Sequence, residues 1–573
     1  MRALLLLLCL AASNAWAACG ATCWVDMTGA GTGSANGTSA ANQCAGPADA
    51  DCTPVSGTTS TVYYCGQRTS ALTLTVGGTT GVPLTYNFKS GDAACSDASI
   101  VIASGSALTL NSTITNSGTR ATTLYYPTLK SSSGAALFIS GADDLLIDHL
   151  ASVSNGTTTG TVTCSATTLS TNIYFDSPTI TDSAADGIRC LPTAASQVWS
   201  GWTINGGTFS TIVGHAIRLS VETTGWTTSY WQNVTITNNT FNRVGYATGV
   251  QAGGAAIFVA NCDRTAPVSS DTCASNNNRG GALTITGNTI TNGGGAGLSG
   301  SNGINVTGFT PVTIANNSIN AQWVSGGGIS TIMTTYAKIY ANTVKNISSA
   351  NDIDGDGIYL DRYTANSYAY YNYVDTCANS VDTQSMGAGI AFYRATNNKA
   401  TGNIVRNCRY GMWWGGNVLA NNLWTGNTTI DCVSSASFPG AGVMETQGEA
   451  VSSPAAGVRV YNNSVVNCPR GITGADDITA YGYNNNYLVT TPHTGQTTGI
   501  STDTSANPQM VGGLSPTTAA GFHLLAVSTL RRTGKDLNIG NYQDCGNRAF
   551  LHPPSIGACE ATSGDQAPAR TMR

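Results

Sequence analysis

The feature that most constrains the fold is a short phrase that recurs along residues 140–490. One version alternates apolar and polar residues and ends in Asn, as in Val234–Asn239, Leu283–Asn288 and Val312–Asn317. A second version, Gly followed by Ile or a similar residue, recurs between copies of the first at steps of 22 to 32 residues. Alternation with a period of two is typical of short strands, and copies this far apart can stack as a parallel ladder rising about 4.8 Å per coil. The sequence therefore predicts a solenoid of stacked coils.

The Asn that ends each phrase is expected at the same corner of every coil. There it can adopt left-handed dihedrals and hydrogen-bond to the Asn above and below. Cysteines check this register independently, because Cys377, Cys408, Cys432 and Cys468 each follow a corner Asn by five residues. Stacked coils align these four in a column, so we expect the disulfides Cys377–Cys408 and Cys432–Cys468.

Charge is scarce in this sequence, and that excludes several classes of protein. Charged residues make up 10% of the 573 residues, and the formal net charge is −5. A nucleic-acid binder needs a basic footprint, and a helical bundle would be rich in Glu, Lys and Leu. Aliphatic and aromatic residues recur throughout, which argues against disorder.

The N-terminus has the pattern of a secretion signal. Residues 1–17 combine a basic start, the apolar run Leu4–Leu10 and a small-x-small ending at Ala15–Ala17. A lipoprotein signal with Cys19 as the lipidated residue is the alternative. Removal of the signal takes Cys9 away and leaves 16 of the 17 cysteines, an even number that indicates disulfides in an exported chain. We expect a monomer outside the cell or in the periplasm, with no membrane span and no nucleic-acid partner.

The repeats resemble those of right-handed parallel β-helix proteins of the pectate-lyase-like superfamily. The phrases at Ala506–Val511, Asp544–Arg548 and Ile556–Glu560 are similar to the closing segment of many secreted bacterial β-helix proteins. Such a segment is expected to cap the last coil, to block a strand edge and to contain a Cys545–Cys559 bridge. The fold expected is all-β, with the following parts: a signal peptide at 1–17, a cysteine-rich N-terminal cap at 18–70, a single-stranded right-handed parallel β-helix at 71–500 and a C-terminal capping segment at 501–573.

Stacking the coils on the Gly-Ile phrase predicts which side chains share an outer face. If the Ile and the residue two positions later point inward, the residues one and three positions later point outward. The candidate catalytic residues found in this way are Asp361, Arg362, Tyr393 and Arg394. The candidate substrate-binding residues are Tyr359, Trp413, Arg218 and Glu445. Aromatic faces suit the apolar faces of sugars, and Arg suits uronate carboxylates. A purely structural ion pair between Asp361 and Arg394, with ordinary exposed tyrosines, is the alternative.

The same coil begins with three carboxylates at alternate positions. Asp352, Asp354 and Asp356 precede Gly357 like the first half of a calcium loop. An EF-hand is excluded because its twelfth position is Tyr363 rather than an acid. The open hypotheses are a one-sided Ca²⁺ site, a solvated turn, and the general acid and base of a glycosidase.

Two enzyme mechanisms and one binding role fit these residues. Resemblance to polysaccharide lyases implies β-elimination, in which a cation or Ca²⁺ neutralises a uronate carboxylate and Arg362 or Arg394 with Tyr393 handles the C5 proton. Hydrolysis would use paired carboxylates drawn from Asp354, Asp356, Asp361 and Glu445. The Gly-His-Gly and Arg-Ile-Lys motifs of polygalacturonases and the Asp-Pro-His-Asp motif of mannuronan epimerases are absent, which favours the lyase. A non-catalytic polysaccharide-binding or adhesin-like protein is the third interpretation.

Overall fold

The structure is a computed structural model of the whole chain. It describes residues 20–30, 37–41, 43–47, 53–79, 81–89, 91–111, 121–154, 160–192, 197–221, 229–245, 254–261, 280–292, 303–320, 327–349, 355–379, 387–416, 421–435, 438–445, 458–474, 478–494, 502–517, 519–525, 527–537, 554–557 and 559. The predicted signal peptide, Cys19 and Cys545 lie outside these residues.

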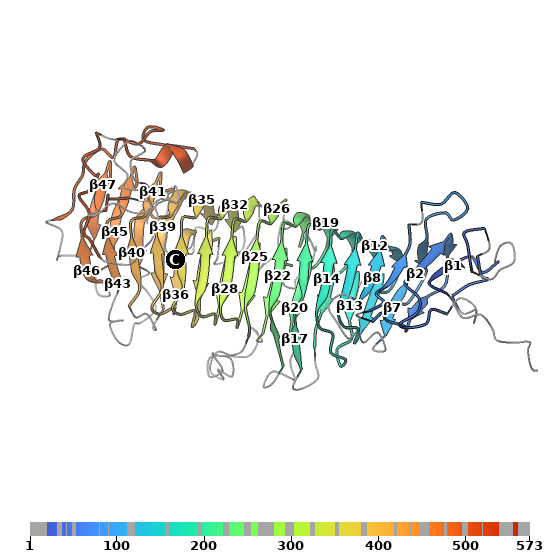
Figure 1. Ribbon diagram of the computed structural model, residues 1–573. Helices are drawn as coiled ribbons and strands as arrows, with labels where there is room; N and C mark the ends of the chain where they lie inside the picture. The colour runs from blue at the N-terminus through green and yellow to red at the C-terminus, as the bar shows by residue number, and fades with distance from the viewer. Residues whose placement is uncertain are drawn as a thin grey trace, which may run out of the picture. The chain divides into compact units, whose positions relative to one another are not determined.

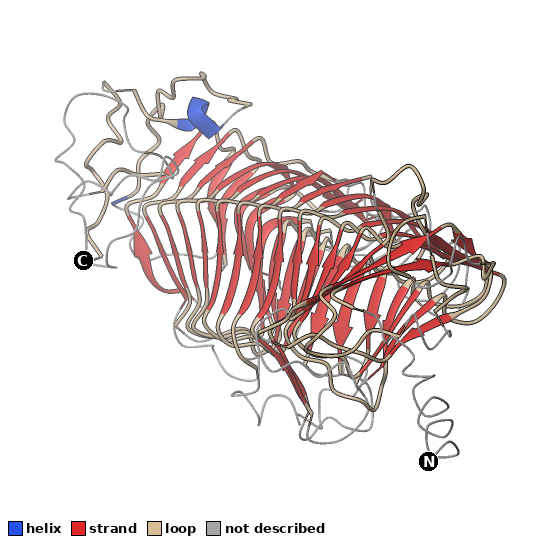
Figure 2. Cartoon of the chain, turned by 45° about the vertical axis from the view of Figure 1, so that its right-hand side comes forward, coloured by secondary structure: helices blue, strands red, loops and turns tan. Residues whose placement is uncertain are grey.

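The chain divides into two units, residues 1–194 with 199–208 and residues 195–198 with 209–573. Within each unit, successive strands join three sheets in turn, which we call A, B and C. Each strand pairs in parallel with its counterparts one coil away, as β22, β25 and β28 of sheet A do (Figure 1). Strands dominate the described residues, and the short helix η4 (Ala519–Phe522) stands out against them (Figure 2).

The strands of the first unit are short and follow one another at coil spacing. Sheet A holds β1 (Thr22–Asp26), β2 (Thr61–Cys65), β5 (Leu84–Asn87), β8 (Thr122–Tyr125), β11 (Leu145–Asp148), β14 (Ile173–Asp176) and β18 (Thr203–Asn205). Sheet B holds β3 (Gln67–Arg68), β6 (Ser99–Ile102), β9 (Thr128–Ser131), β12 (Ala151–Ser154) and β15 (Thr179–Ser183). Sheet C holds β4 (Leu72–Leu74), β7 (Leu108–Asn111), β10 (Leu137–Ser140), β13 (Val162–Cys164) and β16 (Ile188–Cys190).

The second unit repeats this arrangement over more coils. Sheet A holds β22 (Val234–Thr237), β25 (Leu283–Thr286), β28 (Val312–Ala315), β31 (Ala337–Tyr340), β34 (Tyr368–Tyr370), β37 (Lys399–Thr401), β40 (Leu423–Thr425), β43 (Val458–Tyr461) and β46 (Ile478–Gly482). Sheet B holds β19 (Thr208–Ile212), β23 (Thr240–Val244), β26 (Thr289–Thr291), β29 (Ser318–Asn320), β32 (Thr343–Ser349), β35 (Tyr373–Asn379), β38 (Ile404–Cys408), β41 (Thr428–Ile430), β44 (Ser464–Val466) and β47 (Asn485–Tyr487). Sheet C holds β20 (Ile217–Ser220), β24 (Ile257–Ala260), β27 (Ile304–Thr307), β30 (Ile329–Ile332), β33 (Ile358–Asp361), β36 (Ala388–Tyr393), β39 (Tyr410–Gly415), β42 (Ala441–Glu445), β45 (Arg470–Thr473) and β48 (Thr491–Thr494). Two further short strands are β17 (Val198–Ser200) and β21 (Tyr230–Gln232).

This order of strands is that of a parallel β-helix. Crossovers between parallel strands of one sheet are right-handed in nearly all proteins, and the fold is the right-handed parallel β-helix that the repeats predicted. Parallel pairing is already present between β1 and β2. Among the described residues, the stacked strands therefore begin at Thr22, inside the segment that was expected to be an N-terminal cap.

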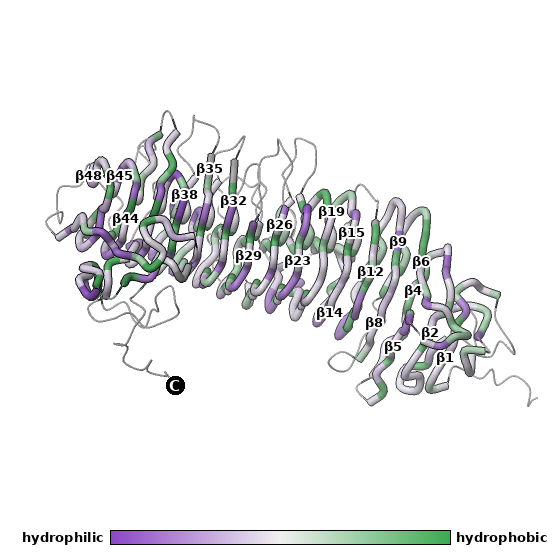
Figure 3. Tube along the Cα trace, turned by 90° about the horizontal axis from the view of Figure 1, so that it is seen from above, coloured by the Kyte–Doolittle hydropathy of each residue, from purple (hydrophilic) through white to green (hydrophobic). Residues whose placement is uncertain are grey.

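Apolar residues of like position form the interior. Leu283 and Ile285 of β25 are buried, and they pair with apolar residues of β22 and β28, whereas Thr284 and Thr286 point outward. Hydrophobic and hydrophilic residues recur in this way at matching places on neighbouring strands (Figure 3). Burying each such aliphatic side chain stabilises the fold by about 1.5–3 kcal/mol before the entropy cost of ordering the chain.

Asparagines form a buried ladder at the corner between sheets A and B. The side-chain amide of Asn317 donates to Asn342 Oδ1 at 3.0 Å and to the Ile285 carbonyl at 3.0 Å, and its backbone N–H donates to the same Oδ1. The ladder consists of Asn239, Asn288, Asn317, Asn342, Asn372, Asn403, Asn427, Asn463 and Asn484. The predicted stacking is confirmed. The expected left-handed dihedral belongs instead to the preceding residue, such as Asn316 with φ 56°, because the ladder Asn must aim its amide inward.

The recurring Gly-Ile phrase has a packing cause. A Cβ on Gly357 would lie 2.3 Å from Val374 Cγ1 and 2.7 Å from the Gly389 carbonyl oxygen. At Gly328, Gly357 and Gly389 the start of the sheet C strand thus approaches both an inward side chain of sheet B and the next coil too closely for a side chain.

The cysteine column is in register, but only one of its two expected disulfides is present. Cys432–Cys468 is confirmed. Cys377 and Cys408 pair across β35 and β38 as predicted, but both are buried free thiols in the structure. The expected Cys377–Cys408 disulfide is therefore wrong for this structure, although the register behind it is right.

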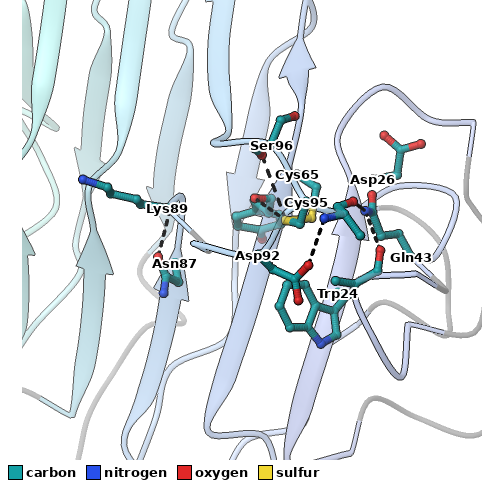
Figure 4. Close-up of a disulfide and its surroundings, with 12 residues drawn as sticks. Trp24, Asp26, Gln43, Cys65, Asn87, Lys89, Asp92, Cys95 and Ser96 are labelled. Atoms are coloured by element: carbon teal, nitrogen blue, oxygen red, sulfur yellow. Dashed lines mark hydrogen bonds between the residues drawn. A yellow bond between two sulfur atoms is a disulfide. The ribbon is translucent and has the colours of Figure 1, made fainter.

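Among disulfides whose two cysteines both lie in the described residues, two were not predicted, and both are in the first unit. Cys164–Cys190 joins β13 to β16. Cys65–Cys95 lies beside Trp24 (Figure 4). In the second unit, Cys559 also forms a disulfide. Disulfides of this number are typical of proteins that fold in an oxidising compartment.

The C-terminal segment packs on the outer face of sheet B. Its apolar residues join outward side chains of four strands in one cluster, made up of Tyr373, Ile404, Ile430, Val466, Met510, Phe522, Leu524, Leu530, Ile556 and Cys559. Thr504 also forms a parallel bridge with Asn485 at the edge of β47. The segment thus covers a sheet face as well as a strand edge.

Candidate functional site

The predicted outer column on sheet C is present in the second unit. Parallel pairing aligns Tyr359 with Ala391, Ala391 with Trp413, and Trp413 with Met444. The intervening Leu360, Phe392 and Trp414 are fully buried. The inward and outward parity read from the Gly-Ile phrase is therefore right.

The aromatic residues of this face interlock. Tyr359, Tyr410 and Trp413 share a cluster with small residues, and Tyr393 and Met444 pack against it; we call this set the aromatic cluster. Its two columns run Tyr359–Ala391–Trp413 and Ala388–Tyr410–Ala441, so large and small residues alternate from coil to coil. The alternation lets each ring lie over a neighbouring Ala.

This packing decides which rings a ligand can reach. Trp413 is 3% exposed and Tyr359 is 8% exposed, whereas Tyr393 is half-buried. The Tyr393 and Trp413 rings stack with centroids 6.1 Å apart. Tyr393 is therefore the accessible ring of the cluster, and it packs against the buried part of the cluster that contains Trp413 and Tyr359.

Asp361 and Arg362 form a local pair at the end of β33. Oδ1 of Asp361 accepts the backbone N–H of Arg362 at 2.7 Å and lies 3.8 Å from Arg362 Nε. The carboxylate is nearly buried, whereas the Arg362 side chain is 40% exposed. The alternative ion pair between Asp361 and Arg394 is not among the ion pairs of the residues described above.

Arg394 occupies the matching turn on the next coil. Its guanidinium lies 5.0 Å from the centre of the Tyr393 ring, and its carbonyl accepts the N–H of Tyr363 at 3.0 Å. A Cβ on Gly416 would lie 2.5 Å from Arg394 Cγ. Gly416 thus makes the space in which the Arg394 side chain lies, and the two arginine turns stack on consecutive coils.

The expected calcium loop is described only at its last carboxylate. Asp356 is fully buried, and its Oδ1 accepts the N–H groups of Gly387 at 3.2 Å and Ala388 at 2.6 Å. That carboxylate oxygen joins two coils, which differs from the solvated turn among the hypotheses. Asp352 and Asp354 lie outside the described residues. Within those residues no group of three His, Cys, Asp or Glu side chains is placed to hold a metal, and Ca²⁺ binding stays a prediction.

Two predicted substrate-binding residues stand apart from the cluster. Arg218 belongs to the same outward column, but β20 lies four coils before β33, about 19 Å away at the usual strand spacing. Its guanidinium lies 6.0 Å from the Phe258 ring. Glu445 pairs with Trp414 through the backbone, and its side chain is not among those described.

The sequence did not predict a polar group inside the last coil. Tyr481 pairs with Val460 and His493 with Ile472, so both occupy inward positions. The Tyr481 hydroxyl lies 2.9 Å from His493 Nδ1 and donates to Asp503 Oδ2. Burial raises the pKa of Asp503 to about 6 and lowers the pKa of His493. The sequence feature that could have revealed this group is a polar residue at a position of the repeat that is otherwise apolar.

No protein-family model and no curated protein sequence matches this chain. Among solved structures it is similar to a pectate lyase, with 13% identity, coverage of 94% of this chain and 96% of the other, and a TM-score of 0.29. The A-module of a mannuronan C-5 epimerase from Azotobacter vinelandii has 11% identity over 76% of this chain and 90% of its own, with a TM-score of 0.34. A surface adhesin of Streptococcus pneumoniae has 13% identity over 60% and 83%, with a TM-score of 0.31.

No helix among the described residues has the length and apolar character needed to cross a bilayer. The three parallel sheets with one strand of each per coil define the architecture without reference to any relative. The chain is a right-handed parallel β-helix protein.

Proposed function

We propose that this is a secreted carbohydrate-active protein that cleaves a uronate-containing polysaccharide by β-elimination on the outer face of sheet C. The observation that carries the proposal is that Arg362 and Arg394 follow strands β33 and β36 on consecutive coils, with the Arg394 guanidinium 5.0 Å from the centre of the accessible Tyr393 ring. Cations are rare in this chain, with 25 Lys and Arg in 573 residues. An arginine beside an aromatic ring, with a second arginine on the preceding coil, is a chemical match for a sugar that carries a carboxylate.

The reaction assigns a task to each of these groups. The guanidinium groups of Arg362 and Arg394 neutralise the uronate carboxylate, which acidifies the proton on C5. Tyr393 accepts that proton on its deprotonated hydroxyl oxygen. The C5 electron pair forms the C4–C5 double bond as the bond from C4 to the glycosidic oxygen breaks, and the departing oxygen takes up a proton. No oxidant or reductant is needed.

Hydrolysis is less well supported by the described carboxylates. A glycosidase needs two carboxyl groups that reach the glycosidic bond from either side. Asp356 is buried against backbone N–H groups, and Asp361 is 5% exposed and held by Arg362. Neither carboxylate has the access that a general acid requires.

The test is absorbance near 235 nm together with a reducing-sugar assay on a panel of uronate and neutral polysaccharides, with and without Ca²⁺. The proposal expects new absorbance with a uronate polymer and its loss in Arg394→Ala. Arg218→Ala is the matched control, because it removes the same group from the outer face of sheet C five coils before Arg394. Reducing ends without absorbance would establish a hydrolase instead. Silence in both assays, with retained binding, would favour a binding protein.

A further inference from the structure

One turn position between sheets A and B has left-handed dihedrals on successive coils. Gly206, Asn238 and Asn316 occupy it with φ of 66°, 57° and 56°, and Gly and Asn are the residues that accept this conformation most readily. Two consecutive coils of the first unit instead carry Tyr126 and His149 there, with φ of 53° and 54°. A bulky ring in this conformation costs backbone energy, so its presence points to a role outside the turn itself.

The rings of Tyr126 and His149 stack on each other. Their centroids are 4.3 Å apart, and the interplanar angle is 12°. Lys89, on the coil before, places its Nζ 4.7 Å from the centre of the Tyr126 ring, so Tyr126 is covered on both faces. Nδ1 of His149 contacts Oδ1 of the adjacent Asp148, and this contact fixes the orientation of the imidazole. The stack is therefore an ordered platform rather than two loose side chains.

Small residues follow His149 on the next coils. The same turn position is occupied by Ser177 one coil later and by Gly206 on the coil after it. Neither residue carries a ring, and the His149 side chain is accordingly 42% exposed. Tyr126 is the ring that stacks on His149 within the part of the chain that the structure describes. Among those residues, the imidazole face away from Tyr126 is therefore left uncovered, above the small Ser177.

Two carboxylates lie beside this ring on the outer face of sheet A. Asp148 of β11 and Asp176 of β14 are backbone partners on consecutive coils, about 4.8 Å apart at the usual strand spacing. One oxygen of each is fixed, because Oδ1 of Asp148 contacts His149 and Oδ1 of Asp176 accepts the Asn205 amide at 3.1 Å. Their Oδ2 atoms accept no hydrogen bond from the residues described. Two oriented acceptors are thus left for hydroxyl groups of a ligand.

We propose that the His149 shelf, formed by Tyr126, Asp148, His149, Asp176 and Ser177, binds a sugar residue of a neutral polysaccharide. The uncovered imidazole face packs against the C–H face of a pyranose ring, and the two carboxylates accept hydrogen bonds from its hydroxyl groups. Charge decides the class of sugar, because two neighbouring carboxylates repel the carboxylate of a uronate and leave a neutral sugar unaffected. The shelf belongs to the first unit, and its binding does not depend on the cleavage proposed for sheet C of the second unit.

The test is isothermal titration calorimetry of the full chain with neutral hexasaccharides of 1,4-linked glucose, xylose, mannose or galactose, and with hexagalacturonate. At least one neutral hexasaccharide should bind. His149→Asn removes the ring but keeps a residue that this turn accepts, and it should weaken that binding at least about fivefold. Ser177→Tyr adds a third ring to the stack and covers the shelf without removing a ring or a carboxylate, and it should weaken binding at least about tenfold. Tyr371→Asn is the matched control, because Tyr371 has the same turn position in the second unit with φ 55°, and it should change the affinity by less than about twofold.

Three outcomes would overturn the proposal. These are the absence of binding by every neutral hexasaccharide, wild-type affinity in Ser177→Tyr, and equal losses in His149→Asn and Tyr371→Asn. Hexagalacturonate distinguishes the shelf from the site on sheet C, because its affinity should be the same in His149→Asn as in the wild type. Arg394→Ala separates the two proposals further, since it should abolish cleavage and leave binding of the neutral sugar intact. Circular dichroism and thermal unfolding verify that each variant is folded.

Discussion

Sheets C and A present tyrosines and cations on the same coils of the second unit, but they use them differently. On sheet C, Trp413 and Tyr359 are nearly buried, and Asp361 is paired with Arg362. On sheet A, Tyr340 and Tyr370 stay half-exposed. The outer side chains of sheet C thus form a packed layer, whereas those of sheet A remain accessible to solvent.

The difference in exposure has its cause in whether a small residue separates the large side chains of a column. On sheet C, Ala391 separates Tyr359 from Trp413, so the large side chains can fold over it and interlock. On sheet A, Tyr340 and Tyr370 occupy successive coils and hold each other upright by stacking. The position of a residue in the repeat therefore determines whether its side chain points outward. The size of the residue at the same position one coil away determines how much of that side chain is exposed to solvent.

The largest expected effect is a difference in the free energy of unfolding between a variant on sheet C and a variant on sheet A. Trp413→Ala should destabilise the second unit by roughly 3–5 kcal/mol, because it removes a buried aromatic side chain and leaves a cavity. Tyr368→Ala on sheet A, where the ring is partly exposed, should cost under about 1 kcal/mol. Thermal unfolding measures both losses of stability. Hydrogen exchange of peptides from β36, β39 and β42 shows whether the loss in Trp413→Ala is located on sheet C. Equal losses would mean that the faces are packed alike and would remove the contrast.

The sequence predicted the coil and its register because both depend on side chains of neighbouring copies. The alternation of Leu283 and Ile285 with threonines, the Asn317 ladder and the Cys432–Cys468 disulfide all follow from like residues stacking on like. Gly357 was visible as a repeat, but its reason, the contact with Val374, needs three-dimensional packing.

The candidate site was predictable only in part. Parity placed Tyr359, Tyr393 and Trp413 on one face, but the sequence could not show that Trp413 is buried, since burial depends on Ala391 and Tyr410 of adjacent coils. The cations and tyrosines on the outer face of sheet A were missed altogether. The change from Thr313 to Lys338 lies in the Asn phrase, where the same alternation of inward and outward residues makes it visible in the sequence.

The next expected effect tests the alternation itself. Ala391→Leu places a larger side chain between Tyr359 and Trp413 and should destabilise the second unit by about 1–3 kcal/mol through overpacking. Thr313→Leu, at an outward position of the threonine face on sheet A, is the control and should lie within about 0.5 kcal/mol of the wild type. A neutral Ala391→Leu would show that the aromatic cluster is loosely packed.

A smaller effect concerns the turn that holds Arg394. Gly416 has φ +89°, and a Cβ there would meet Arg394 Cγ and Tyr393 Cε2. Gly416→Ala should therefore displace Arg394 and reduce uronate cleavage by about tenfold, with a stability cost of about 1 kcal/mol for the backbone strain. Affinity for a neutral hexasaccharide at the His149 shelf should not change. Cleavage is followed by absorbance near 235 nm, and wild-type cleavage in this variant would contradict the role given to Arg394.

The smallest expected effect is a pH dependence of the stacked tyrosines on sheet A. Burial, and after it the neighbouring Tyr340, raises the pKa of Tyr370 to about 12. The folded chain therefore favours the neutral phenol more than the unfolded chain does, so this contribution to stability is full below about pH 10 and is lost as the pH rises through about 12. Tyr370→Phe should lessen the alkaline loss of stability by under about 1 kcal/mol, because solvent at the half-exposed ring weakens the effect. Urea unfolding at pH 8 and at pH 11 measures the difference between this variant and the wild type. An alkaline loss of the same size in both would mean that Tyr370 ionises as readily in the folded chain as in the unfolded one, and its stacked ring would then be no better shielded from water than a free tyrosine.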